Sequence, residues 1–110
     1  MAFVEVAEVN EIPNGTMKSF LAGIWQVLVV NVNGKFYAIN NACSHEGQSL
    51  SQGTLKGKTV ICPLHGAKFD VTTGKCLAGP KSGFFIRGRI PDNKVFEVKV
   101  ETGKILINAS

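Results

Sequence analysis

Residues 25–39 read WQVLVVNVNGKFYAI, two runs of apolar and β-branched residues on either side of Asn33-Gly34. β-Branched and aromatic side chains are favoured in strands. Asn-Gly is the strongest short signal for a hairpin, because both central residues of a type I′ turn need positive φ. We therefore predict an antiparallel hairpin with strands over 25–32 and 35–39.

The rest of the chain repeats this pattern of short strands separated by turns. Apolar residues alternate with a period of two, which is typical of strands, and no long amphipathic helix is visible. Further strands are predicted over residues 2–7, 16–21, 58–62, 67–71, 95–100 and 104–107. The segment from Leu77 to Lys94 contains two prolines and three glycines and is predicted to be mainly loop. The predicted fold class is all-β, an antiparallel sandwich or barrel in a single domain over residues 1–110.

Composition and charge argue against several function classes. Twelve Lys and Arg against eight Asp and Glu give a formal net charge of +4, but the basic residues form no run. This argues against a nucleic-acid-binding surface and favours an acidic partner. No apolar stretch approaches the roughly 18 residues of a membrane helix, and the first residues do not resemble a signal peptide. With an odd number of cysteines, a soluble protein in the reducing cytoplasm is expected.

Two short stretches contain both histidines and two of the three cysteines. They read Cys43-Ser-His45-Glu-Gly and Cys62-Pro-Leu-His65-Gly, and each lies on a loop next to a predicted strand. Two such loops at one end of a β domain can converge to present two thiolates and two imidazoles. Thiolates bind soft or borderline metals, and imidazole adds zinc, copper or iron to the candidates. We predict these two cysteines and two histidines as metal ligands.

The spacing of the four residues leaves two interpretations open. A zinc site of the Cys₂His₂ type usually groups its cysteines in one half and its histidines in the other. Here each half holds one cysteine and one histidine, which suits a centre with two unlike metal positions. A [2Fe–2S] cluster in which two histidines replace two cysteines on one iron has this ligand set.

Downstream of the second pair the chain reads Phe69-Asp70, followed by Gly74. Together with the two ligand pairs, this pattern resembles the Rieske ferredoxin family over nearly the whole chain. The resemblance implies a Rieske-like antiparallel β-sandwich or barrel with a small cluster-binding subdomain over about residues 40–80, formed by the two loops. It also implies one [2Fe–2S] cluster per chain.

By position, the resemblance assigns the two thiolates to the inner iron and the two imidazoles to the outer, more exposed iron. The ligands it implies are Cys43, His45, Cys62 and His65. The remaining cysteine, Cys76, is predicted to be a buried and inert thiol.

Four positions depart from the high-potential branch of this family. That branch has a disulfide between the two ligand loops, and the matching positions here are Gln48 and Leu64. It also has a serine and a tyrosine hydroxyl near the cluster, where this chain has Ala67 and Phe69. Hydrogen bonds that favour the reduced cluster raise its potential. Their loss predicts a potential toward the lower end of the Rieske range of roughly −150 to +300 mV.

A cluster with four protein ligands has no open coordination position, so the chain is predicted to be an electron carrier and not itself an enzyme. The resemblance implies transfer from an NAD(P)H-dependent flavoprotein reductase to a terminal oxygenase, often one that hydroxylates aromatic rings. Two alternatives remain open. One is the small Rieske subunit of an assimilatory nitrite reductase, and the other is a zinc-stabilised interaction module without a redox role.

Overall fold

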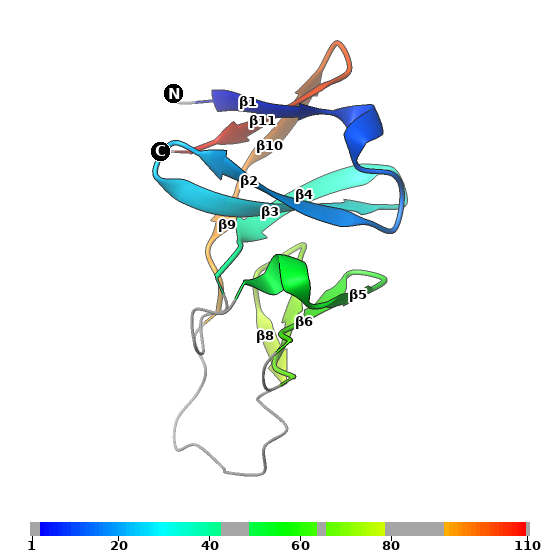
Figure 1. The fold of residues 1–110 in the computed structure, drawn as a ribbon, viewed down its shortest axis with the longest axis vertical. Helices are drawn as coiled ribbons and strands as arrows, with labels where there is room; N and C mark the ends of the chain where they lie inside the picture. The colour runs from blue at the N-terminus through cyan, green and yellow to red at the C-terminus, as the bar shows by residue number, and fades with distance from the viewer. Residues whose placement is uncertain (1–2, 43–48, 64–65, 79–91, 110) are drawn as a thin grey trace.

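A computed structural model describes residues 3–42, 49–63, 66–78 and 92–109. In these residues the chain forms three antiparallel sheets and two short 3₁₀ helices, η1 (Val9–Glu11) and η2 (Leu50–Gln52) (Figure 1). The predicted all-β, antiparallel fold class is therefore confirmed. No helix in the described part of the chain is long and apolar enough to cross a membrane.

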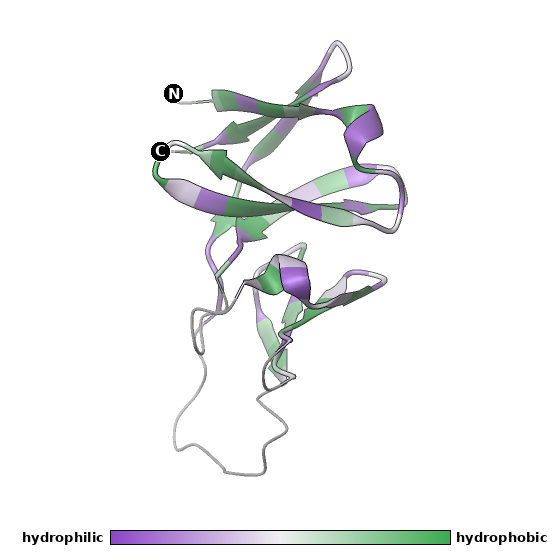
Figure 2. Ribbon diagram, in the orientation of Figure 1, coloured by the Kyte–Doolittle hydropathy of each residue, from purple (hydrophilic) through white to green (hydrophobic). Residues whose placement is uncertain are grey.

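Two of the sheets face each other and form a sandwich (Figure 1). The first has the order β1-β11-β10 and the second β2-β3-β4-β9. Their strands are β1 (Phe3–Glu8), β2 (Met17–Ala22), β3 (Trp25–Val32), β4 (Lys35–Asn40), β9 (Val95–Phe96), β10 (Val98–Glu101) and β11 (Lys104–Asn108). Bands of apolar and polar residues alternate along the outer strands (Figure 2), as expected for strands with one buried face.

The hairpin of residues 25–39 forms as predicted. Its strands pair from Val27↔Asn40 to Val32↔Lys35, and the two turn residues Asn33 and Gly34 have φ of 54° and 89°. The local sequence therefore sets the register of the central strand pair.

Strand β3 is buried on both faces, which explains its unbroken apolar run. Val27 and Val29 belong to the core of the sandwich. Leu28 and Val30 point the other way, into a second core. All four side chains have no exposed surface.

The second core lies between the sandwich and a small third sheet with the order β5-β6-β7-β8. The strands of this small sheet are β5 (Thr54–Lys56), β6 (Thr59–Ile61), β7 (Lys68–Asp70) and β8 (Cys76–Ala78). It lies beside the sandwich, below β3 and β4 in Figure 1, and within the predicted 40–80 segment. That this segment is a separate cluster-binding subdomain stays a prediction.

Three predicted elements differ from the structure, and one further strand was not predicted. The strand predicted over 95–100 is interrupted at Glu97, because β9 pairs with β4 whereas β10 pairs with β11 in the other sheet. The alternation of apolar and polar residues continues across this change of sheet, so the sequence does not reveal that the strand is interrupted. Strand β5 was not predicted, and β8 occupies the start of the segment predicted as loop from Leu77. In β1, a register shift between Glu5 and Ala7 interrupts the regular alternation.

Candidate metal centre

Of the four predicted ligands, the structure describes Cys62. Cys43, His45 and His65 lie outside the described residues, as do Gln48 and Leu64. In the described ranges no three His, Cys, Asp or Glu residues gather closely enough to hold a metal ion. The complete ligand set therefore stays a prediction, and the described part of the site is Cys62 with the ends of both loops.

Cys62 follows β6 directly and is 2% exposed. It belongs to the second core, together with Leu50, Ala67 and Phe69. Its N–H donates a hydrogen bond to the carbonyl of Ala67 at 2.7 Å, and its carbonyl accepts one from the N–H of Gly66 at 3.1 Å. These two bonds close the base of the second loop.

Gly66 has a φ of 81°, a conformation that side-chain-bearing residues rarely adopt. The chain therefore turns tightly after the second ligand pair. Pro63, which fixes its own φ, lies exposed inside the same turn. The backbone at Cys62 is thus held by a glycine and a proline as well as by hydrogen bonds.

Asn41 fixes the two ends of the first loop. Ala42 and Ser49, the described residues that flank the first loop, form an isolated antiparallel bridge and so lie side by side. The Asn41 side chain donates to Ser49 Oγ at 2.8 Å and accepts from the Ser51 N–H at 2.9 Å, while its carbonyl accepts from the Leu50 N–H at 2.7 Å. Asn41 was not among the site residues predicted from the sequence. The available signal was an Asn at a strand end, a residue type that often binds nearby backbone groups.

The two loops meet at Gly53 and Ile61. Gly53 immediately precedes β5, and a Cβ atom on it would lie 2.0 Å from the carbonyl oxygen of Ile61. The neighbouring pair is Thr54↔Ile61, and Ile61 is the residue before Cys62. The chain leaving the first loop therefore lies directly against the chain entering the second.

The Asp70 carboxylate organises the turn after β7. It accepts hydrogen bonds from the Thr72 N–H at 2.8 Å and the Thr72 hydroxyl at 2.6 Å, and Lys58 Nζ lies 3.7 Å away. Burial raises the pKa of Asp70, but the hydrogen bonds from Thr72 and the charge of Lys58 outweigh it, so the pKa lies below its ordinary value. The carboxylate is therefore held in its charged form.

Gly74 packs this turn against the chain that returns to the sandwich. It has a φ of 77°, and a Cβ on it would lie 2.3 Å from the Asn93 carbonyl oxygen. Its own carbonyl accepts a hydrogen bond from the Asn93 N–H at 2.7 Å. The aspartate and the glycine that carried the resemblance thus have structural roles beside the site.

Cys76 differs from its prediction. It begins β8 and is half-buried, not fully buried, and it packs against the second core. Its N–H donates to the Asp92 carboxylate at 2.8 Å. The small sheet is only four short strands wide, so an edge position such as β8 remains partly open to solvent.

Cys62, which is the predicted ligand that the structure describes, and its surroundings fit an iron–sulfur centre. A buried thiol at a tightly closed turn is a suitable metal ligand once deprotonated. Ala42 and Ser49, which flank the first loop, form a bridge, and Leu50 shares the second core with Cys62 at the start of the second loop. Neither Ala67 nor Phe69, both fully buried beside Cys62, brings a hydroxyl group to this core.

A model of the Rieske [2Fe–2S] domain family matches residues 2–105. The chain belongs to this family. Among its relatives is the ferredoxin component of the naphthalene 1,2-dioxygenase/salicylate 5-hydroxylase systems of Ralstonia sp. The two are 30% identical over 105 residues, covering 96% of this chain and 93% of that protein.

Solved structures agree with the Rieske fold. The ferredoxin of carbazole 1,9a-dioxygenase from Nocardioides aromaticivorans IC177 superposes with a TM-score of 0.88 at 28% identity, over all of both chains. A second match comes from a complex of reduced oxygenase and oxidized ferredoxin in carbazole 1,9a-dioxygenase. Its TM-score is 0.86 at 30% identity, covering 99% of this chain and 94% of that one.

The predicted Rieske-type ferredoxin is therefore confirmed, and family membership implies the [2Fe–2S] cluster in place of zinc. Because these relatives are the ferredoxin components of their systems, this Rieske ferredoxin is an electron-transfer protein and not the catalytic enzyme.

Proposed function

We propose that this Rieske ferredoxin carries single electrons from an NAD(P)H-dependent flavoprotein reductase to a terminal oxygenase of the aromatic-ring-hydroxylating class. The observation that supports this most strongly is the nature of the relatives, which are full-length ferredoxin components of aromatic dioxygenase systems. One similar ferredoxin has been solved together with its oxygenase.

We propose Cys43 and Cys62 as ligands of the inner iron and His45 and His65 as ligands of the outer iron, with one cluster per chain. This proposal is supported by the burial of Cys62, by the bridge between Ala42 and Ser49 and by the close contact of Gly53 with Ile61. When bound, such a cluster supplies reversible one-electron chemistry.

The protein's own residues then have three tasks. Asn41 and the bond between Cys62 and Ala67 hold the loop ends in place. The second core excludes water from the thiol of Cys62. Ala67 and Phe69 provide no hydroxyl group beside Cys62. This supports a midpoint reduction potential of the cluster toward the lower end of the range of roughly −150 to +300 mV.

Electron paramagnetic resonance of the dithionite-reduced protein tests the cluster. We expect the signal of a mixed-ligand [2Fe–2S] centre, with two irons and two sulfides per chain. Cys62→Ser should abolish or strongly alter it, whereas Cys76→Ser, a matched thiol removal on the same small sheet, should leave it unchanged. A colourless protein without iron would contradict the proposal and favour the zinc-stabilised module.

The electron route needs a separate test. The oxidised protein should be reduced by NAD(P)H only in the presence of a flavoprotein reductase, and it should then support product formation by a terminal oxygenase of the aromatic-ring-hydroxylating class. Co-purification with a large sirohaem-containing subunit would instead identify the protein as part of a nitrite reductase.

A further inference from the structure

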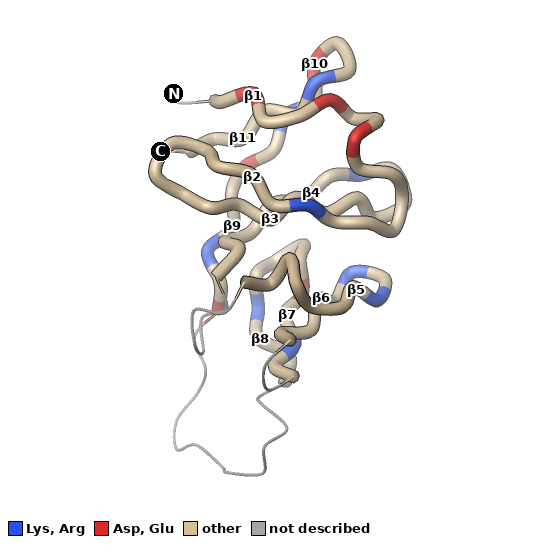
Figure 3. The backbone as a smooth tube through the Cα atoms, viewed as in Figure 1, with Lys and Arg blue, Asp and Glu red and all other residues tan. Residues whose placement is uncertain are grey.

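Charge is unevenly divided between the sandwich and the small sheet (Figure 3). The described residues 49–78 carry four lysines against a single aspartate. The described residues of the sandwich, 3–42 and 92–109, carry five lysines against six acidic residues. The excess positive charge of the described residues therefore lies entirely on the segment that forms the small sheet and contains Cys62.

The sandwich lysines are engaged within the molecule. Each lies near a carboxylate or over an aromatic ring, as follows: Lys18 with Glu11 and Phe20, Lys35 with Tyr37, Lys94 with Trp25 and Phe96, Lys99 with Glu101 and Phe3, and Lys104 with Glu5. Opposite charges and ring faces reduce the positive potential that these side chains present to a partner.

The lysines of the small sheet are different. Lys58 pairs with Asp70 at 3.7 Å. For Lys56, Lys68 and Lys75, no carboxylate or aromatic ring among the described residues is in contact with the ammonium group. We call these three residues the lysine surface.

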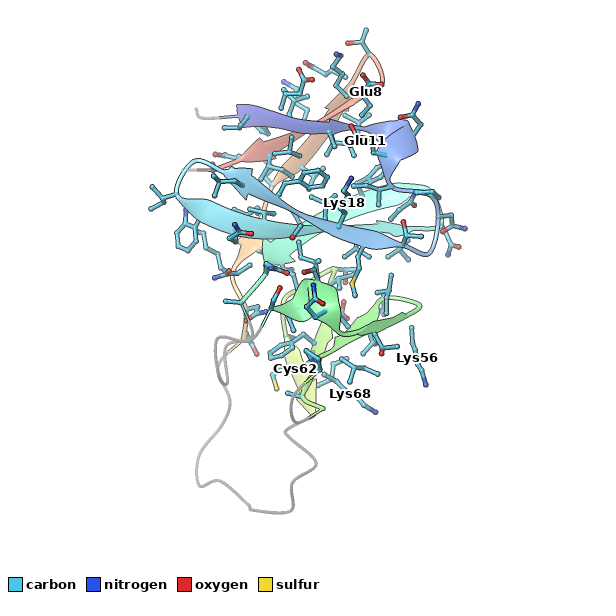
Figure 4. The ribbon with its side chains drawn as sticks, viewed as in Figure 1. Glu8, Glu11, Lys18, Lys56, Cys62 and Lys68 are labelled. Carbon is cyan, nitrogen blue, oxygen red and sulfur yellow. The ribbon has the colours of Figure 1, made fainter. Side chains whose placement is uncertain are left out.

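The register places Lys56 and Lys68 of the lysine surface on the outer face of the small sheet. Val60 and Phe69 point inward to the second core. Lys68 pairs with Ile61 and Lys56 with Thr59, so both have the opposite parity and point outward. Figure 4 shows Lys56 and Lys68 projecting away from the sandwich.

One member of the lysine surface, Lys68, is next to the segment that carries Cys62. Lys68 lies directly opposite Ile61, the residue before Cys62. Lys75 lies opposite Asp70, since its carbonyl accepts the Asp70 N–H at 2.9 Å. Electron transfer falls off with distance, so a partner must dock close to the cluster, and complementary charge accelerates that encounter.

We propose that the lysine surface is a docking site for an acidic face of the protein's electron-transfer partner. This inference rests on the proposed function and adds to it the location and the sign of the contact. The favoured occupant is an acidic protein because the three ammonium groups are exposed or half-buried and not neutralised by the described residues.

The test compares two double variants of equal net charge. Lys56→Glu/Lys68→Glu reverses two of the three charges of the lysine surface. Lys99→Glu/Lys104→Glu reverses one lysine on β10 and one on β11, strands that lie at the other end of the view in Figure 1. Electron paramagnetic resonance first establishes that each variant holds the cluster. If the wild type holds none, the proposed function fails before docking is tested.

In two separate experiments the reduced protein then gives its single electron to a small acceptor. The anionic acceptor hexacyanoferrate(III) becomes hexacyanoferrate(II), and the cationic acceptor hexaammineruthenium(III) becomes the ruthenium(II) complex. At low salt we expect reversal of the lysine surface to lower the rate of electron transfer to the anionic acceptor by about tenfold. The rate of electron transfer to the cationic acceptor should rise. The control pair should change either rate by less than about twofold. The midpoint potentials of all variants are also measured, so that the rates of electron transfer can be compared at equal driving force.

Binding provides a readout that needs no turnover. The ¹⁵N-labelled oxidised protein is titrated with a reduced, acidic blue-copper protein at low salt. We expect chemical-shift changes on β5–β7, their loss in 0.5 M salt at a Debye length of about 4 Å, and their loss in the Lys56→Glu/Lys68→Glu variant. Equal effects of the two double variants, or shift changes centred on the β10–β11 turn, would overturn the proposal while leaving the electron-carrier function intact.

Discussion

The sandwich and the small sheet are stabilised in different ways. The sandwich has strands of up to eight residues joined by tight hairpins, and its registers follow from local turns such as Asn33-Gly34. The small sheet has strands of three residues, and it depends on close contacts between distant segments, such as Gly53 with Ile61 and Gly74 with Asn93. The sandwich is thus a scaffold, and the small sheet is the part in which single atoms determine the geometry of the site.

The largest expected effect comes from strand β3, which contributes to both cores. Leu28→Ala removes side-chain volume from the core that contains Cys62, and Val29→Ala removes it from the sandwich core. Each should lower the free energy of unfolding, by about 3 kcal/mol for leucine and somewhat less for valine. Urea unfolding measures the stability and iron content measures the site.

We expect the two variants to differ in cluster retention. Leu28→Ala should lose iron at urea concentrations where the sandwich is still folded by circular dichroism, whereas Val29→Ala should lose both together. Equal iron retention at equal stability would show that the two cores unfold as one unit.

Gly53→Ala tests the contact between the two loops. Because the new Cβ would lie 2.0 Å from the Ile61 carbonyl oxygen, either β5 or β6 must move. We expect a loss of about 2–3 kcal/mol and an altered electron paramagnetic resonance signal. Gly57→Ala is the control. Its φ is 62° with no atom within 4 Å, so it should cost about 1 kcal/mol of backbone strain and leave the signal unchanged.

Asp70 gives a pH-dependent test of the turn after β7. Its pKa is lowered in the folded protein, so its contribution to stability is present above the ordinary value of 3.8 and is lost as the pH falls through the folded pKa. Asp70→Asn should remove that component and cost about 1–2 kcal/mol at neutral pH, mainly through weaker hydrogen bonds from Thr72. Lys58 adds little because its side chain is 62% exposed.

The measurement is the free energy of unfolding against pH for the wild type and Asp70→Asn. The two curves should converge below pH 3.8, where the wild-type carboxylate takes up its proton. Curves that stay parallel down to acid pH would show that ionisation of Asp70 does not stabilise the fold.

The sequence predicted the sandwich better than the small sheet for a physical reason. The hairpin at 25–39 carries its strand propensity and its turn residues in one continuous stretch, so local information is sufficient. Strand β5 contains a single apolar residue and β8 has no alternation of apolar and polar residues, so neither shows the pattern that predicted the equally short β6 and β7. The interruption at Glu97 is invisible because both halves of the segment are strands, paired in different sheets.

The candidate site shows the same division. The type and spacing of the cysteines and histidines were enough to predict the cluster family, since ligand chemistry depends on residue identity. The supports at Asn41 and Gly53 were missed, because their roles depend on Ser49, Ser51 and Ile61 being brought next to them by the fold.

The smallest expected effect concerns the potential and not the stability. Phe69 is fully buried in the core of Cys62, at the position where high-potential relatives are expected to have a tyrosine. In Phe69→Tyr, a new hydrogen bond that is stronger in the reduced state by about 1 kcal/mol would raise the midpoint by about 40 mV, since 59 mV corresponds to a factor of ten for one electron.

Phe20→Tyr is the matched control, since Phe20 packs against the sandwich core instead. Voltammetry of the two variants should show a positive shift for Phe69→Tyr and none for Phe20→Tyr. An unshifted or more negative midpoint in Phe69→Tyr, with the cluster intact, would mean that the hydroxyl does not reach the cluster from β7. The low potential would then have to arise elsewhere in the site. A shift confined to Phe69→Tyr would show that the core of the small sheet tunes the potential, while the sandwich only supports it.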